Sequence, residues 1–247
     1  MSSTSTSTST STSTSTSTST SDFILDKTTY VNMERFNEQI AAFGISNGFV
    51  SLLYKTGAVL AGGAITNYVY NTIHPDKKIP MHPDSDIDIW VYDPMMNMTI
   101  DASHAQRAYK HWILSEFNKF FLEAGMVVSS GPVNSPDTYS DLLKEFKTQG
   151  DTKIKCNWWI NKTTGKRIQL MFMNKPPSEA VLLFDLTVCR CFMHSSESGS
   201  LYWKCSNDAK RDISANQLTI PKIMTKNTNS RIEKYVERYG FTLVEES

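Results

Sequence analysis

AVLAGGAITNYVYNTIHPDKKIPMHPDSDIDIWVYD, the stretch from Ala58 to Asp93, decides the fold of this chain. It opens with a short apolar strand at Val59 to Ala61, passes through Gly62 and Gly63 into an amphipathic helix, and ends in a second apolar strand. A glycine turn that opens a helix offers unpaired backbone N–H groups and the positive end of the helix dipole, which together suit phosphate. We therefore expect both glycines to bind a polyphosphate; the plainer alternative is a tight strand-to-helix turn.

The second strand carries two acidic residues inside an apolar run. Because side chains alternate along a strand, Asp86 and Asp88 point to one face and the isoleucines between and after them point to the other. Adjacent carboxylates repel each other unless a cation lies between them, so we predict that Asp86 and Asp88 bind Mg²⁺ or Mn²⁺. The alternative is a solvated edge strand, which fits less well because Trp90 and Tyr92 continue the same face.

Composition excludes several classes of protein. The 247 residues include 25 basic and 25 acidic side chains, so the chain lacks the positive charge of a strongly electrostatic nucleic-acid binder. It has no apolar run of about 18 residues, so we expect no membrane span. The four cysteines form no CxxC pair, which favours a reduced, cytoplasmic protein.

The chain divides into three parts. Residues 1–21 are a Ser/Thr tail with nothing to bury, and we expect them to be disordered. Residues 22–206 form the main domain, and 207–247 form a helical extension packed on it. Helices alternate with strands early and hairpins dominate later, which predicts an α+β fold with a small mixed sheet backed by helices. Further elements are expected at Ser103–Ala124, Met126–Val128, Ser140–Phe146, Lys153–Asn161, Lys166–Asn174, Val181–His194, Leu201–Cys205 and Asn229–Tyr239.

Two motifs together resemble the DNA polymerase β-like nucleotidyltransferase superfamily: LAGGAITN at Leu60 to Asn67 and SDIDIWVYD at Ser85 to Asp93. The resemblance implies a mixed sheet backed by helices, two Mg²⁺ ions, and transfer of a nucleoside monophosphate from an NTP to an acceptor. The GGA start is similar to that of tRNA nucleotidyltransferases. Those enzymes carry an arginine-aspartate pair where this chain has Thr66 and Asn67, and their linker to the aspartates is shorter, which argues against CCA addition.

A looser resemblance covers most of Leu60 to Phe241. IQLMFM, FDLTVCR and RIEKYVERYGF resemble segments of nucleotidyltransferase-like proteins of large DNA viruses and phages. If the protein is viral, that resemblance implies a location in the host cytoplasm.

Three further residues are candidates for the site. The superfamily usually places a third carboxylate on a strand beside the paired aspartates. Asp185, inside the apolar run Val181–His194, fits that role. The alternative is a structural ion pair between Asp185 and an Arg or Lys. Arg167 either clamps a triphosphate or is a solvated arginine after a hairpin turn. Asn67, one helical turn past the glycines, either reaches a phosphate or sugar or faces solvent.

The sequence thus predicts a Mg²⁺-dependent nucleotidyltransferase that takes an NTP as substrate. The acceptor stays open between RNA, a protein side chain and a small molecule. Two alternatives stay open as well: a glycosyltransferase that uses its D-x-D motif, and an inactive nucleotide-binding or structural module of the same fold. In the C-terminal helix, Arg231, Lys234 and Arg238 form a basic stripe that we interpret as a solvated face.

Overall fold

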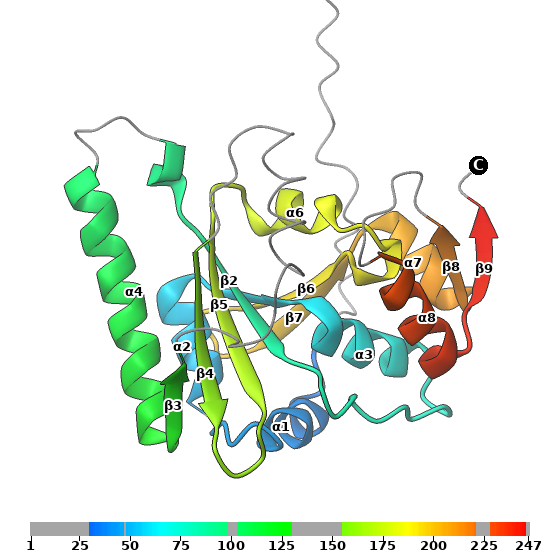
Figure 1. The fold of residues 1–247 in the computed structure, drawn as a ribbon, viewed down its shortest axis with the longest axis horizontal. Coiled ribbons are helices and arrows are strands. Elements are labelled where there is room, and N and C mark those ends of the chain that lie inside the picture. Colours follow the sequence, from blue (N-terminus) through cyan, green and yellow to red (C-terminus); the bar gives the residue numbers. More distant parts are fainter. Residues whose placement is uncertain (1–29, 47, 98–102, 130–154, 221–227, 246–247) are drawn as a thin grey trace, which may run out of the picture.

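A computed structural model describes residues 30–46, 48–97, 103–129, 155–220 and 228–245 (Figure 1). Its centre is a seven-stranded sheet in the order β3-β4-β5-β2-β1-β6-β7. Only β2 and β5 pair in parallel within this sheet, and the other described pairs are antiparallel. The strands are β1 Val59–Ala61, β2 Ile87–Tyr92, β3 Met126–Ser129, β4 Lys155–Asn161, β5 Arg167–Met173, β6 Cys191–Ser195 and β7 Leu201–Cys205.

Helices back the sheet and close its ends. In Figure 1, α4 lies at one end beside β3 and β4, while the C-terminal elements lie at the other end beside α3. The first four helices along the chain are α1 Met33–Ala41, α2 Phe49–Thr56, α3 Gly62–Ile73 and α4 Ser103–Glu123. The α+β class predicted from the sequence is confirmed.

One face of the central strands forms the core. Leu60, Ile89 and Leu170 lie side by side on β1, β2 and β5, and each is at most 1% exposed. Their side chains join one hydrophobic cluster with Phe residues of α2 and α4, including Phe49 and Phe121. Because side chains alternate in a strand, burial of this face directs Asp86, Asp88 and their row of neighbours to the opposite face.

Most predicted elements are confirmed, but the segment before β6 is not a long strand. The predicted strand Val181–His194 is wrong: α6 Pro177–Ala180 leads into 3₁₀ turns at Val181–Leu183 and Thr187–Cys189, and only Cys191–Ser195 is extended. An apolar run of this length does not distinguish a strand from buried turns, because both are apolar throughout. The predicted helix Ser140–Phe146 and the Ser/Thr tail lie outside the described residues.

The C-terminal extension holds the predicted helix, together with a second helix and two strands that the sequence analysis did not predict. Its elements are α7 Asn207–Ser214, β8 Gln217–Ile220, α8 Thr228–Tyr239 and β9 Thr242–Glu245, and β8 and β9 form a separate parallel pair. α8 packs on α3, where Asn67 Nδ2 donates to Tyr239 Oη (3.2 Å) and Tyr70 Oη donates to the Tyr239 carbonyl (3.1 Å). No helix in the described part of the chain has the length and apolarity to cross a membrane.

Candidate functional site

Asp88 rests against the glycine turn that opens α3. β1 and β2 are antiparallel, and Ala61, the last residue of β1, lies opposite Asp88. Gly62 has φ +76°, and a Cβ added there would overlap Asp88 Oδ2, so only glycine fits both the backbone and the space. Asp88 is 8% exposed, and its carboxylate lies at the N-terminus of a twelve-residue helix, where the helix dipole favours a negative charge. The first role of Gly62 is therefore to admit Asp88.

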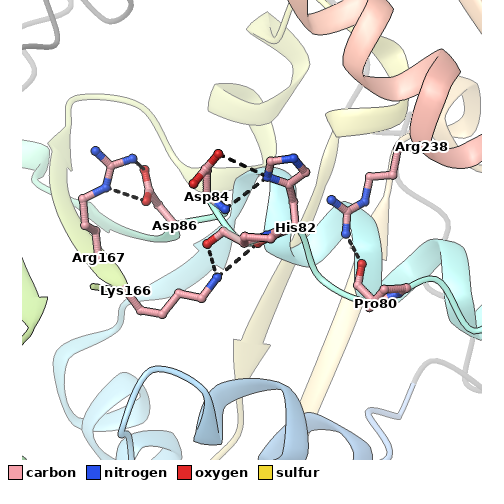
Figure 2. Close-up of polar contacts among 8 residues, drawn as sticks. Pro80, His82, Asp84, Asp86, Lys166, Arg167 and Arg238 are labelled. Carbon is pink, nitrogen blue, oxygen red and sulfur yellow. Dashed lines mark hydrogen bonds and ion pairs between the residues drawn. The ribbon is translucent and has the colours of Figure 1, made fainter. Parts of the chain in front are cut away.

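Asp86 lies directly before β2 and pairs with Arg167, the first residue of the neighbouring strand β5 (Figure 2). Arg167 Nε donates to Oδ1 at 2.9 Å and Nη2 donates to Oδ2 at 3.0 Å, so both carboxylate oxygens are engaged. The Arg167 guanidinium also lies over the Trp158 ring of β4, 5.7 Å from its centroid. Burial raises the pKa of Asp86 above its ordinary value, while the positive charges of Arg167, Lys234 and Lys166 oppose that rise.

The two aspartates suit a metal that arrives with its substrate. Among the described residues, no three His, Cys, Asp or Glu side chains gather closely enough to hold a metal on their own. Mg²⁺ is commonly bound by one or two carboxylates, with substrate phosphates and water completing its shell. Asp86 and Asp88, which alternation places on one face of β2, fit that pattern, but the three-aspartate group expected from the sequence is not assembled.

Asp185 has a different partner. It lies between the two 3₁₀ turns, and its side chain is 5% exposed. Oδ1 pairs with Arg231 of α8 and accepts from the Leu186 backbone N–H (3.0 Å), while Oδ2 accepts from Thr228 Oγ1 (3.0 Å). These are contacts of the structural alternative: Asp185 joins the start of α8 to the main sheet domain.

Asn67 is likewise used within the fold. It is 4% exposed, and its Nδ2 donates to the Ile79 carbonyl (3.2 Å) as well as to Tyr239. Its Oδ1 accepts from Asn71 Nδ2 at 3.3 Å. The residue ties α3 to the following loop and to α8, so the structure supports neither a solvent-facing position nor a phosphate contact. Gly63 faces α8 as well: a Cβ there would lie 3.6 Å from Tyr235 Oη.

The sequence analysis missed a group of cations around the loop that precedes β2. Figure 2 shows Lys166 and Arg238 reaching this loop from opposite sides. Lys166 Nζ donates to the carbonyls of His82 (3.1 Å) and Pro83, and Arg238 donates to the carbonyl of Pro80. The Lys234 and Arg238 spacing was visible in the sequence, but nothing local indicated that Arg238 reaches the loop before β2.

Among known proteins, similarity to this chain is found only in solved structures. No family model and no curated protein matches the chain. The Thermotoga maritima CCA-adding enzyme complexed with tRNA is similar over 87% of this chain and 40% of its own, with 13% identity and a TM-score of 0.40. A CCA-adding enzyme in complex with CTP is similar over 81% of this chain and 40% of its own, with 13% identity and a TM-score of 0.42.

Both neighbours are CCA-adding enzymes. This chain spans about 40% of their length. Similarity at this level does not decide a function.

Proposed function

We propose that this protein is a Mg²⁺-dependent nucleotidyltransferase, which moves a nucleoside monophosphate from an NTP to an acceptor hydroxyl and releases pyrophosphate. The observation that carries the proposal is the position of the aspartates. Asp88 lies at the N-terminus of α3, against Gly62, and Asp86 lies two residues earlier, directly before β2. This brings carboxylates for a cation and a helix end for an anion to one place.

Each residue of the site has a physical task in this proposal. Asp86 and Asp88 would hold Mg²⁺, and when bound the ion would neutralise triphosphate charge and stabilise the leaving pyrophosphate. The N-terminus of α3 would orient the phosphates through its dipole and first-turn N–H groups. Arg167 engages Asp86 through a bidentate pair and would balance the charge of that carboxylate until a metal displaces the pair.

The reaction itself is a displacement at the α-phosphorus. The acceptor oxygen forms a bond to that atom, the bond to the bridging oxygen of the β-phosphate breaks, and pyrophosphate leaves. The hydroxyl proton passes to a carboxylate of the site or to solvent. Positioning and charge stabilisation, rather than a covalent intermediate, would supply the rate enhancement.

The test is a matrix of labelled NTPs against acceptors from the three open classes: RNA, proteins and small molecules carrying hydroxyls. We expect Mg²⁺- or Mn²⁺-dependent pyrophosphate release with at least one pair, and its loss in Asp88→Asn, which keeps the size of the side chain. Pyrophosphate release that persists unchanged in a folded Asp86→Asn/Asp88→Asn protein would exclude this site. Metal and NTP binding without turnover for every pair would support the inactive nucleotide-binding module instead.

A further inference from the structure

Cys191 and Cys205 face each other at one end of the sheet. They are direct partners in the antiparallel pair of β6 and β7, and their Sγ atoms are in contact (2.6 Å). In the next pair along the ladder, the Ser206 N–H donates to the Arg190 carbonyl (3.0 Å). Because hydrogen-bonded and non-hydrogen-bonded pairs alternate in an antiparallel ladder, Cys191 and Cys205 form a non-hydrogen-bonded pair, the kind that brings opposite side chains closer together.

This strand pairing matches what a disulfide requires. A disulfide joins cysteines whose Cα atoms lie about 4.4–6.8 Å apart, and opposite residues of a non-hydrogen-bonded pair lie about 4.5 Å apart. The buried Cys189 has other partners: its Sγ donates to Tyr235 Oη (3.2 Å) and accepts from Arg231 Nη2 (3.6 Å). The fold therefore pairs Cys191 with Cys205 and directs Cys189 toward α8.

The cysteine pair lies where the sheet leads into the C-terminal extension. β7 is an edge strand of the seven-stranded sheet, with β6 as its neighbour in the strand order. Ser206, the residue after Cys205, caps α7 by accepting from the Ala209 backbone N–H (3.1 Å). A covalent bond between Cys191 and Cys205 would therefore fasten both the edge strand and the start of the extension to β6.

We infer that Cys191 and Cys205 are a site of reversible disulfide formation, with a low-molecular-weight disulfide, oxidised glutathione, as the oxidant. Cys205 reacts first, because it lies on the edge strand and is 5% exposed, whereas Cys191 is completely buried. The Cys205 thiolate attacks one sulfur of the oxidant, which forms a mixed disulfide and releases one glutathione thiolate. The Cys191 thiolate then attacks Cys205 Sγ and releases the second. Two electrons pass from the cysteines to the oxidant, and the two thiol protons pass to the released glutathione thiolates.

The closed hairpin should react slowly. Burial, and then the neighbouring Cys205 thiol, raise the pKa of Cys191 well above its ordinary value. The thiolate is the nucleophile in disulfide exchange, so little of Cys191 is in the reactive form while β7 is paired. Opening of the edge strand exposes both thiols, and urea below the unfolding midpoint should therefore accelerate the oxidation.

The experiment treats the full chain with oxidised glutathione in two samples, one native and one during refolding from urea. Remaining thiols are blocked with iodoacetamide, and the chain is digested with trypsin. Trypsin cleaves after Arg190 and Lys204, which places Cys191 and Cys205 in neighbouring peptides and separates both from Cys189. We expect mass spectrometry to find these two peptides joined by a disulfide. The oxidised protein should melt about 5 °C or more above the reduced one, and dithiothreitol should reverse both changes.

Three variants test the order of the steps. Cys189→Ala is the matched control, because it removes a buried thiol that contacts Tyr235, and it should keep both the linked peptides and the rise in melting temperature. Cys205→Ala should abolish both. Cys191→Ala should stop with glutathione attached to Cys205, because the second attack cannot occur.

Two results would overturn the inference. One is the absence of the linked peptides from both the native and the refolded wild-type samples. The other is wild-type protein that ends with a separate glutathione on each of Cys191 and Cys205. Because these measurements need neither a metal nor an NTP, their outcome is independent of the proposed nucleotidyl transfer.

Discussion

Arg167 and a metal ion compete for the same carboxylate, which allows a quantitative prediction. Arg167 engages both oxygens of Asp86, so a cation that binds Asp86 must displace this pair or share it. The side chains are 37% and 20% exposed, respectively, which places the pair between a surface ion pair and a buried one. Such a pair contributes about 1–2 kcal/mol to the free energy of unfolding, and a metal that binds Asp86 must offset the loss of this amount.

Arg167→Gln should therefore increase the affinity for Mn²⁺ by about 5- to 30-fold, since about 1.4 kcal/mol corresponds to a factor of ten. Without metal the free energy of unfolding of the variant should fall by a similar amount, because the partly buried Asp86 would lack its counter-ion. Free Mn²⁺ measured by electron paramagnetic resonance gives the affinity directly, without an activity assay.

Two controls separate the bidentate pair from charge alone. Arg167→Lys keeps the charge but lacks the planar fork, so it should bind Mn²⁺ more tightly than wild type but less tightly than Arg167→Gln. Lys55→Gln removes the same charge from a surface ion pair with Glu116 and should bind Mn²⁺ as wild type does. If folded Arg167→Gln bound Mn²⁺ no more tightly than wild type, Arg167 would not compete for Asp86, and the reasoning would be refuted.

Three further changes test the surrounding structure. Gly62→Ala should lower the free energy of unfolding by at least about 2 kcal/mol and displace Asp88, because φ is +76° and the new Cβ would overlap the carboxylate. Gly63→Ala is the matched control, since its Cβ would meet only an ordinary van der Waals contact. Equal melting temperatures for the two variants would contradict this role of Gly62. Asp185→Asn should lower the free energy of unfolding, measured in urea, by about 2 kcal/mol, because the ion pair with Arg231 is lost. A variant with wild-type stability but no turnover would instead show that Asp185 is a catalytic residue. Burial, and then the charge of Lys204, lower the pKa of His194, and its Nε2 has no hydrogen-bond partner among the described residues. The free energy of unfolding should therefore fall as the pH drops below about 6.5, the ordinary pKa of histidine. The unfolded chain then takes up a proton that the folded one resists, so His194→Gln should flatten the decline between pH 7 and 5, and an identical slope would remove His194 as its cause.

Local pattern was sufficient to predict the centre of this protein. The β1–Gly-Gly–α3 unit and the D-x-D strand were predicted because alternation, helical periodicity and glycine punctuation act over a few residues. The same alternation placed Asp86 and Asp88 on one face, opposite the buried isoleucines. The α4 helix and the β4–β5 hairpin followed from the same short-range signals.

Only tertiary structure decided which side chains meet. Asp185 lies 46 residues before Arg231, and Asn67 lies 172 residues before Tyr239, so no local spacing indicates either contact. The prediction of a strand at Val181–His194 was wrong because an apolar run is equally compatible with a strand and with buried turns. The basic stripe of α8 looked solvated because helical periodicity places side chains on faces of one helix, whereas the packing of α8 on α3 decides what those faces meet.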